Sequence, residues 1–340
     1  MKVVFALDKF AGTLTAAEVC EALVKGWRAG REYDDLCVLP LSDGGPGFVA
    51  VMAAANAGQL VEVEVDDPLG RPVAAEFWLD EGQTAWVESA QACGLHLLSP
   101  DERDPERTST RGVGQLLAAV LAKDPKRVVV GVGGTATNDG GRGVLEVLDR
   151  WPAEIPLEVA TDVDNPLLGI NGASAVFGPQ KGADANAVQR LDAALAAWVP
   201  ELGAADLAKV PGAGAGGGLG FALLRLGGRR VSGVETVIGA VRLREELADA
   251  DLVVTGEGSY DTTSLRGKVV SGVAKAATEA GVPCVVVAGR VSVGRREMAA
   301  SGVDSSYSLT DLAGSEQAAM AEPARWATVA GERLASQWGR

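Results

Sequence analysis

The chain has 340 residues, a formal net charge of −14 and 47% hydrophobic residues, which favours a folded protein with a large core and two domains. So acidic a protein lacks the basic surface that nucleic acid requires, and no window approaches the ~20 apolar residues of a membrane span. Since no secretion signal is visible either, we expect a cytoplasmic protein without nucleic-acid or membrane partners, either monomeric or homodimeric.

The few cysteine and histidine residues limit metal and nucleophilic chemistry. Cys20, Cys37, Cys93 and Cys284 are scattered, so we interpret them as reduced, mostly buried thiols. His96 is the only histidine and lies among leucines, which favours a packed structural residue. A zinc site or a Ser-His-Asp triad therefore has little to draw on.

The N-terminal region alternates between strand and helix. An apolar strand at residues 2–7 precedes a helix that Thr15 begins as N-cap, with Glu18 completing a capping box, and that ends near Gly30. A second strand and helix follow at residues 36–41 and 45–55.

The middle of the chain has a different pattern, and the alternation returns at the end. Short strands joined by tight turns indicate a meander, and a longer series of helices and strands continues from it. The expected strands are 61–65, 74–79, 85–88, 127–132, 157–161, 252–255, 284–288 and 305–309, and the expected helices are 114–122, 187–199, 269–280 and 324–337. We predict an α/β protein with a discontinuous, doubly wound parallel-sheet domain (1–60 and 250–340) and an inserted α/β domain with a mixed sheet (61–249).

Several glycine-rich or acidic loops follow predicted strands, at the sheet edge where ligands bind in α/β proteins. In the first loop, LSDGGPG at residues 41–47, Asp43, Gly44 and Gly45 form either a ligand loop or an ordinary Asx turn. The second loop, residues 131–143, forms a candidate phosphate nest. Its candidate phosphate-binding residues are Gly133, Gly134, Thr135, Asn138, Asp139 and Gly140, with Arg142 as a candidate substrate ligand.

The loop at residues 131–143 also imitates a dinucleotide fingerprint. Gly131, Gly133 and Ala136 have the required spacing after a strand, but TNDGGRG prolongs the loop where that fingerprint begins a helix. A nicotinamide oxidoreductase is therefore the weaker interpretation, and a glycine-rich connector is another.

The third loop, residues 160–182, and the fourth loop, residues 255–268, supply carboxylates and cations. Asp162 and Asp164 are candidate Mg²⁺ ligands, since this ion prefers hard oxygen donors. The third loop adds Gln180 and Lys181 as phosphate ligands. The fourth adds Glu257 and Asp261 as candidates to bind metal or the substrate hydroxyl, and Arg266 and Lys268 as candidates to bind anionic phosphates. A polar turn is the alternative for the third loop.

A fifth run, PGAGAGGGLG, comes before a helix expected at Phe221. Gly214, Gly216 and Gly217 could bind phosphate through their N–H groups at the helix start, or the run could act as a hinge.

These segments occur in the same order as in bacterial-type glycerate kinases, which the chain resembles over nearly its whole length. The resemblance includes GVGGTATNDGGRG, DVDNPLLG with GPQKG, GAGAGGGLG, TGEGSYD, SDGGPG and DKFAGTLTA, the last containing Asp8 and Lys9. It implies a flavodoxin-like domain, a second α/β domain, ATP and Mg²⁺ as cofactors, and phosphorylation of D-glycerate. We expect the 2-phosphate as product and an active site in the interdomain cleft.

The chain departs from the family pattern in loops expected to hold substrate. Lys9 and Ala11 stand where the family has Ser and Lys, Pro46 replaces a Glu, and Ser259 replaces an Arg. A kinase of a different small hydroxy acid and a non-catalytic nucleotide-binding relative are therefore the alternatives. In the leading hypothesis the catalytic residues are Asp43, Asp162, Glu257, Asp261 and Lys268; Asp8, Lys9, Gly44, Gly45, Arg142, Gln180 and Arg266 bind substrate; and Asp162 and Asp164 bind metal.

Overall fold

The computed structural model describes residues 1–265 and 267–339. Its contacts divide the chain into two compact units. Unit 1 comprises residues 1–43 and 234–340, and unit 2 comprises residues 44–233. The sequence placed the boundaries near 60 and 250 instead. The difference at the first boundary involves the helix at residues 48–55, which packs against strands of unit 2.

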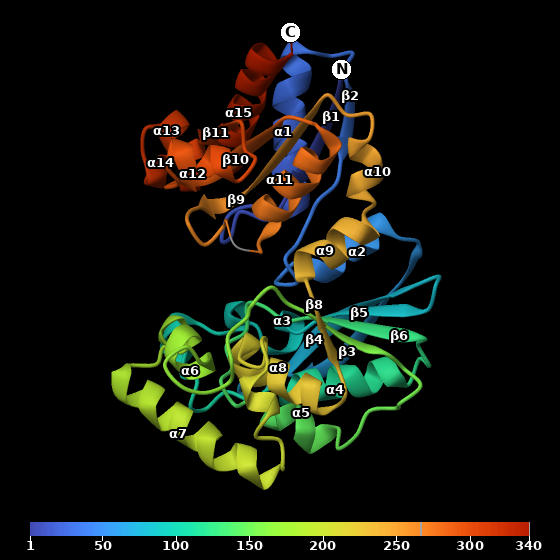
Figure 1. Ribbon diagram of the computed structural model, residues 1–340, viewed down its shortest axis with the longest axis vertical. Coiled ribbons are helices and arrows are strands. Elements are labelled where there is room, and N and C mark those ends of the chain that lie inside the picture. The colour runs from blue at the N-terminus through green and yellow to red at the C-terminus, as the bar shows by residue number, and fades with distance from the viewer. Residues whose placement is uncertain (266, 340) are drawn as a thin grey trace. The chain divides into compact units, whose positions relative to one another are not determined.

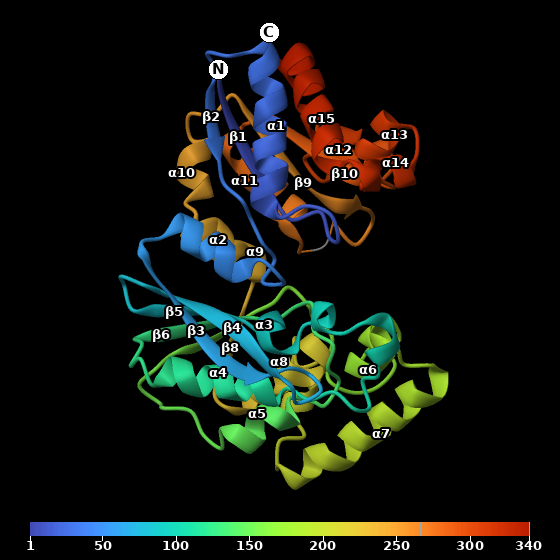
Figure 2. The ribbon, with the colours of Figure 1, turned by 180° about the vertical axis from the view of Figure 1, so that it is seen from behind.

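Unit 1 contains a five-stranded parallel sheet with helices on both faces (Figures 1 and 2). The strands occur in the order β11-β10-β9-β1-β2, which is the flavodoxin-like arrangement. They are β1 (Lys2–Leu7), β2 (Asp35–Val38), β9 (Leu252–Tyr260), β10 (Cys284–Val291) and β11 (Ser305–Ser308). The helices are α1 (Ala16–Gly30), α10 (Leu243–Leu247), α11 (Val269–Ala280), α12 (Arg295–Ala300), α13 (Leu309–Ala313), α14 (Glu316–Ala321) and α15 (Pro323–Trp338).

The helices α1 and α15 pack side by side on one face of this sheet (Figure 2). Glycines allow the close approach: a Cβ on Gly26 would lie 1.9 Å from the Thr328 carbonyl oxygen, and one on Gly331 would lie 2.2 Å from that of Leu23. The start of α1 follows the sequence prediction, because Thr15 and Glu18 form the expected capping box.

Unit 2 contains a six-stranded mixed sheet in the order β3-β4-β5-β6-β7-β8. The β3-β4-β5 part is the expected antiparallel meander, and β5 to β8 are parallel. The strands are β3 (Gly58–Asp66), β4 (Pro72–Asp80), β5 (Thr84–Glu88), β6 (Arg127–Gly131), β7 (Leu157–Ala160) and β8 (Arg229–Val231). The α-helices are α2 (Phe48–Ala55), α3 (Ala90–Cys93), α4 (Arg111–Leu121), α5 (Arg142–Val147), α6 (Ala173–Phe177), α7 (Ala185–Glu201) and α8 (Ala215–Arg225), and α9 (Gly233–Ala240) begins at the unit boundary.

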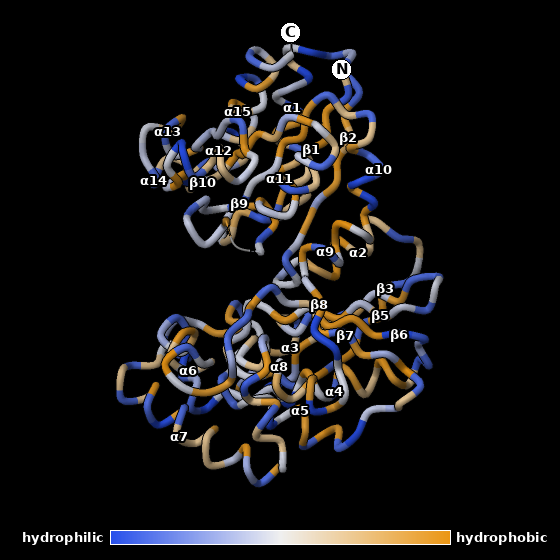
Figure 3. Tube along the Cα trace, in the orientation of Figure 1, coloured by the Kyte–Doolittle hydropathy of each residue, from blue (hydrophilic) through white to orange (hydrophobic). Residues whose placement is uncertain are grey.

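Hydropathy explains which faces are buried. The central strand β6 is almost continuously hydrophobic, as expected of a parallel strand covered on both faces, whereas α7 alternates between hydrophobic and hydrophilic residues (Figure 3). In α7, Leu191, Leu195 and Trp198 supply the buried side. Among the described residues, none of the helices combines the length and apolar character that crossing a bilayer requires.

The expectations for the sulfur and imidazole side chains have different outcomes. All four cysteines are free thiols; Cys20, Cys93 and Cys284 are buried, and burial raises the pKa of each to about 12. The prediction for His96 is wrong, because this side chain is exposed. It lies in the short 3-10 helix Leu95–Leu97, whose tight turn leaves both flanking leucines only partly buried.

Candidate active site

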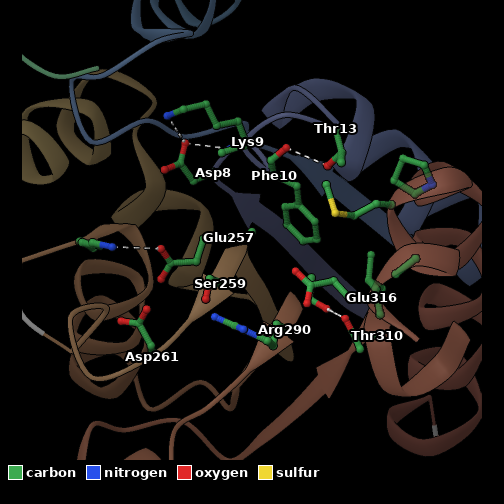
Figure 4. Close-up of a pocket in the computed structure, with 18 residues that line it drawn as sticks. Asp8, Lys9, Phe10, Thr13, Glu257, Ser259, Asp261, Arg290, Thr310 and Glu316 are labelled. Atoms are coloured by element: carbon green, nitrogen blue, oxygen red, sulfur yellow. Dashed lines mark hydrogen bonds and ion pairs between the residues drawn. The ribbon is translucent and has the colours of Figure 1, made fainter. Parts of the chain in front are cut away.

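A pocket of about 380 Å³ opens within unit 1 at the carboxyl ends of β1, β9 and β10 (Figure 4). Here the strand order reverses between β1 and β9, which is the usual position of a ligand in an open parallel sheet. Several residues proposed from the sequence line it together. They are Asp8, Lys9, Glu257, Asp261 and Lys268.

Asp8 is one of two buried carboxyl groups of the pocket, with 8% of its surface exposed. Burial raises its pKa to about 7, and the nearby charges of Asp43 and Glu257 act in the same direction, while Lys9 opposes them. The Lys9 backbone N–H donates to Asp8 Oδ1 at 2.7 Å, and the Lys9 ammonium lies 3.5 Å from the same oxygen. Asp43, Asp8 and Glu257 therefore lie close enough to influence one another.

Glu257 is as buried as Asp8, and burial raises the pKa of Glu257 as well. The Lys268 ammonium lies 3.7 Å from Glu257 Oε2. The other carboxylate oxygen of Glu257, Oε1, is buried and has no hydrogen-bond partner among the described residues. A buried carboxylate with an unused acceptor in a pocket is well suited to receive a hydrogen bond from a bound hydroxyl group.

Asp261 differs from these two acids because its carboxylate serves the local loop. Its Oδ1 accepts hydrogen bonds from the Thr263 backbone N–H at 2.8 Å and hydroxyl at 2.6 Å, and these hold its pKa below the usual range. Of the two candidates for the base, the geometry therefore favours Glu257.

Other residues of this pocket were not predicted from the sequence. Arg290 follows the buried part of β10, and Thr310 and Glu316 come from α13 and α14 (Figure 4). The position of Arg290 just after an apolar parallel strand is the same signal that identified the other loops. Thr310 comes directly after the strand expected at residues 305–309, so the same signal could have identified it. Glu316 follows no strand end and could be placed only by the fold.

In unit 2, the second and third predicted loops meet at the carboxyl ends of β6 and β7. Lys181 connects them: its ammonium donates to Thr135 Oγ1 at 3.0 Å and to the Thr137 carbonyl oxygen at 2.6 Å. The side chain is 2% exposed, and burial lowers its pKa to about 8. Lys181 therefore joins two loops whose sequences are far apart.

Asp139 is committed to the structure of its own loop. Its Oδ2 accepts from the Thr110 backbone N–H and hydroxyl and from the Gly143 N–H, and Oδ1 accepts from the Gly141 N–H. Four donors leave the carboxylate little capacity for a ligand. Beside it, the Asn138 amide nitrogen donates to Ser174 Oγ at 2.8 Å, while its buried oxygen has no partner among the described residues.

The fifth glycine run packs directly against the second loop. Gly216, Gly217 and Gly218 all have positive φ, and a Cβ on Gly217 would lie 1.8 Å from the Thr137 carbonyl oxygen. This left-handed stretch interrupts the start of α8, so regular helix begins later than the assigned first residue, Ala215. Gly140 and Gly214 are also buried in packing contacts. Close loop packing thus accounts for these glycines, and phosphate contact at them stays a prediction.

The first loop contributes to both units, because the boundary falls between Asp43 and Gly44. A Cβ on Gly44 would lie 2.8 Å from the Ala160 carbonyl oxygen, and one on Gly133 would lie 2.9 Å from the Gly45 Cα. Gly44 and Gly45 therefore form part of the packed base of the loop cluster. Gly133 and Gly134 are less buried and are better placed to offer N–H groups.

The acidic residues proposed as metal ligands lie on one strand end but have different surroundings. Asp162 is half-buried and accepts a hydrogen bond from the Ser232 hydroxyl at 2.6 Å. Asp164 is exposed and pairs with Arg230 at 2.5 Å. Among the described residues there is no cluster of three or more acidic, histidine or cysteine side chains suited to a metal ion.

Two other predicted ligands, Arg142 and Gln180, are placed differently. The Arg142 guanidinium lies 4.9 Å from the centre of the Trp198 ring, so it stacks on α7, an arrangement that the loop sequence did not reveal. Gln180 is exposed on the 3-10 helix Pro179–Lys181, while the neighbouring Lys181 turns inward. Arg266 lies outside the described residues. The dinucleotide interpretation also lacks its helix, because α5 begins only at Arg142.

Comparison with known proteins identifies the same family over both units. A family model described as the glycerate kinase family matches residues 3–150 and 147–339. The chain is 39% identical to a glycerate kinase of Bacillus subtilis, with 91% of this chain and 90% of that protein aligned. It is 36% identical to glycerate 2-kinase of Escherichia coli, with 91% and 90% aligned.

A solved structure agrees with these sequence matches. It is the crystal structure of a Salmonella typhimurium LT2 protein that carries the provisional name glycerate kinase 2. It superposes with a TM-score of 0.80 at 35% identity, and the match covers 99% of this chain and 97% of that one.

Proposed function

Since the chain belongs to the glycerate kinase family and is a phosphotransferase with an alcohol group as acceptor, we propose that it transfers the γ-phosphoryl group of ATP to D-glycerate. The 2-phosphate is the proposed product, in line with the name of the E. coli relative. The observation that carries the proposal is the pocket of unit 1, where carboxyl groups, lysines and an arginine converge at the switch point of a parallel sheet.

In this proposal the pocket of unit 1 receives the hydroxy acid. Glu257 accepts the hydrogen bond of the reacting hydroxyl and takes its proton as the new O–P bond forms. Two features support this role: its Oε1 is buried without a partner among the described residues, and burial raises its pKa toward neutrality. Asp8, with a pKa of about 7, and Lys9 bind and orient the acid.

Unit 2 holds the nucleotide in the proposal, through Gly133, Gly134, Thr135 and the ammonium of Lys181. The donors present fit Mg²⁺, because this ion is bound by one or two carboxylates and completes its shell with phosphate oxygens and waters. Asp162, half-buried at the end of β7, would hold it, with Asp164 nearby in sequence. Bound Mg²⁺ would neutralise phosphate charge.

Direct transfer requires the acid and the nucleotide to bind in one active site, and the interdomain cleft that the sequence predicts for this site stays a prediction. Lys268 and Asp43, both in unit 1, complete the proposed catalytic set. The cytoplasm is the proposed location, because free buried thiols are typical of a reducing compartment. The altered motif at Lys9 and Ser259 keeps another small hydroxy acid as the second candidate substrate.

The test is ADP release from Mg-ATP with D-glycerate, with ³¹P NMR to identify the phosphorylated position. Asp162→Asn should raise the Mg²⁺ concentration needed for half-maximal rate by about 10- to 100-fold. The matched control is Asp206→Asn, whose side chain is fully exposed and pairs only with Lys209 among the described residues. No turnover of D-glycerate by the wild type would refute the substrate, and an unchanged Mg²⁺ requirement would remove Asp162 from the metal site.

A further inference from the structure

The cations of the unit 1 pocket differ in their surroundings. The Lys9 ammonium is 3.5 Å from Asp8, and the Lys268 ammonium is 3.7 Å from Glu257. Arg290 lines the same pocket, yet within the described part of the chain its side chain has neither an ion pair nor a hydrogen bond. A guanidinium beside several carboxyl groups, but bonded to none of the described ones, has its donors available for an anionic ligand.

The position of Arg290 in the sheet places it beside another residue of the pocket. In the parallel ladder between β9 and β10, Arg290 lies directly opposite Ser259. Figure 4 shows the Arg290 side chain extending toward Ser259 on the same side of the pocket. Neighbouring strands are only ~4.8 Å apart, so a guanidinium from either position can reach the same region.

Ser259 itself is suited to leave room for this guanidinium. Its hydroxyl is buried and has no hydrogen-bond partner among the described residues. An arginine at 259 next to the one at 290 would place two like charges side by side across the ladder, which is unfavourable. The small side chain at 259 and the long cationic one at 290 are therefore mutually compatible.

We propose that Arg290 is the residue that recognises the carboxylate of the hydroxy-acid substrate. The proposal rests on the proposed function and specifies that the enzyme recognises the carboxylate group of the substrate. A guanidinium binds a carboxylate with two parallel hydrogen bonds, which an ammonium cannot match in geometry. Arg290 thus selects acids over uncharged polyols such as glycerol.

The experiment compares Arg290→Gln and Arg290→Lys with the wild type in steady-state kinetics. Arg290→Gln should raise KM for D-glycerate by about 10- to 100-fold, the usual effect of losing hydrogen bonds to a charged group, and leave KM for ATP unchanged. The KM of Arg290→Lys for D-glycerate should lie between those of the wild type and Arg290→Gln. Lysine keeps the positive charge but cannot donate two parallel hydrogen bonds to the carboxylate. Activity toward glycerol should not change, so the preference for the acid should fall with the rise in KM.

Two further variants separate recognition from folding. Arg295→Gln removes an exposed arginine of α12 outside the pocket and should leave every constant within about two-fold. The exchanged pair Ser259→Arg with Arg290→Ser should regain most of the affinity that Arg290→Ser alone loses. Thermal unfolding of each variant identifies any constant that changes through loss of structure.

Each remaining outcome decides the proposal. An unchanged KM for D-glycerate in Arg290→Gln overturns it, and so does a raised KM for ATP alone, which would assign the guanidinium to phosphate. If the wild type does not phosphorylate D-glycerate, the proposed function fails; calorimetric titration with D-glycerate and L-lactate then judges Arg290 separately. Carboxylate binding that disappears in Arg290→Gln supports the proposal, and binding that persists, or is absent from the wild type, refutes it.

Discussion

The two loop regions of this protein use polar residues in opposite ways. In unit 1, Asp8 and Glu257 are buried with raised pKa values, and Glu257 keeps an oxygen without a partner among the described residues. In unit 2, Asp139 accepts four hydrogen bonds from its own and a neighbouring loop.

A polar residue can bind a ligand or stabilise a loop, and the sequence alone does not distinguish these two roles. Groups that are buried and incompletely satisfied lower stability and are available to a ligand. Groups that are buried and fully bonded stabilise a loop and have little capacity left. Substitutions in the unit 1 pocket should therefore affect activity more than stability, and those in the packed glycine loops of unit 2 should do the reverse.

The largest expected effect is on catalysis by Glu257→Gln. Without the base, kcat should fall by about 10²- to 10⁴-fold, the usual contribution of general base catalysis. Stability should stay the same or rise slightly, because a neutral amide avoids the cost of burying the charge. The checks are kcat from ADP release and the urea midpoint. A stable variant with full kcat would remove Glu257 from the mechanism. An unfolded variant would contradict the expectation that substitutions in the unit 1 pocket affect activity more than stability.

The second effect is a pH dependence of stability caused by Asp8. Its pKa is 3.8 when unperturbed and about 7 in the fold, so the folded state holds a proton that the unfolded state releases between these values. The stabilising contribution is complete below pH 3.8 and is lost as pH rises through 7. It should reach up to about 4 kcal/mol.

The difference in unfolding free energy between Asp8→Asn and wild type measures this contribution, and should shift in favour of the variant from pH 4 to 8. Asp261→Asn is the control with the opposite sign. The pKa of Asp261 is lowered by its hydrogen bonds to Thr263, so that group contributes stability above its unfolded pKa and loses it as pH falls. A flat difference for Asp8→Asn would show that this carboxyl titrates normally.

The third effect is on stability alone and concerns Gly217→Ala. Its φ is +72°, and the new Cβ would lie 1.8 Å from the Thr137 carbonyl oxygen, so the loops must separate. We expect a loss of about 3 kcal/mol or more, measured by urea unfolding. Gly227→Ala is the matched control. It has φ +94° with open space around the Cβ, so it should lose only the ~1–2 kcal/mol of the left-handed backbone. Equal losses in both would refute the packing argument.

Much of the fold could be predicted because its signals are local. The apolar strand at Lys2–Leu7, the capping box of Thr15 and Glu18, and the antiparallel meander each depend on neighbouring residues. The boundary near residue 60 differed from the contact division, because whether the helix α2 packs on one sheet or the other is a long-range property. The short strand β8 was missed since its sequence, Arg229–Val231, is too brief and too charged to show a strand pattern.

The candidate site likewise has features that local sequence predicts and features that depend on long-range contacts. By itself the sequence determined which residue types follow each strand, and so it named Glu257 and Lys268 before any fold was known, while the family resemblance named Asp8. Only the tertiary structure decided which oxygens and cations were already bonded. It assigned Asp139 to its loop, placed Arg142 on Trp198, and put Arg290 opposite Ser259. The physical reason is that a side chain's capacity to bind a ligand is what remains after its neighbours have been satisfied, and those neighbours come from distant parts of the chain.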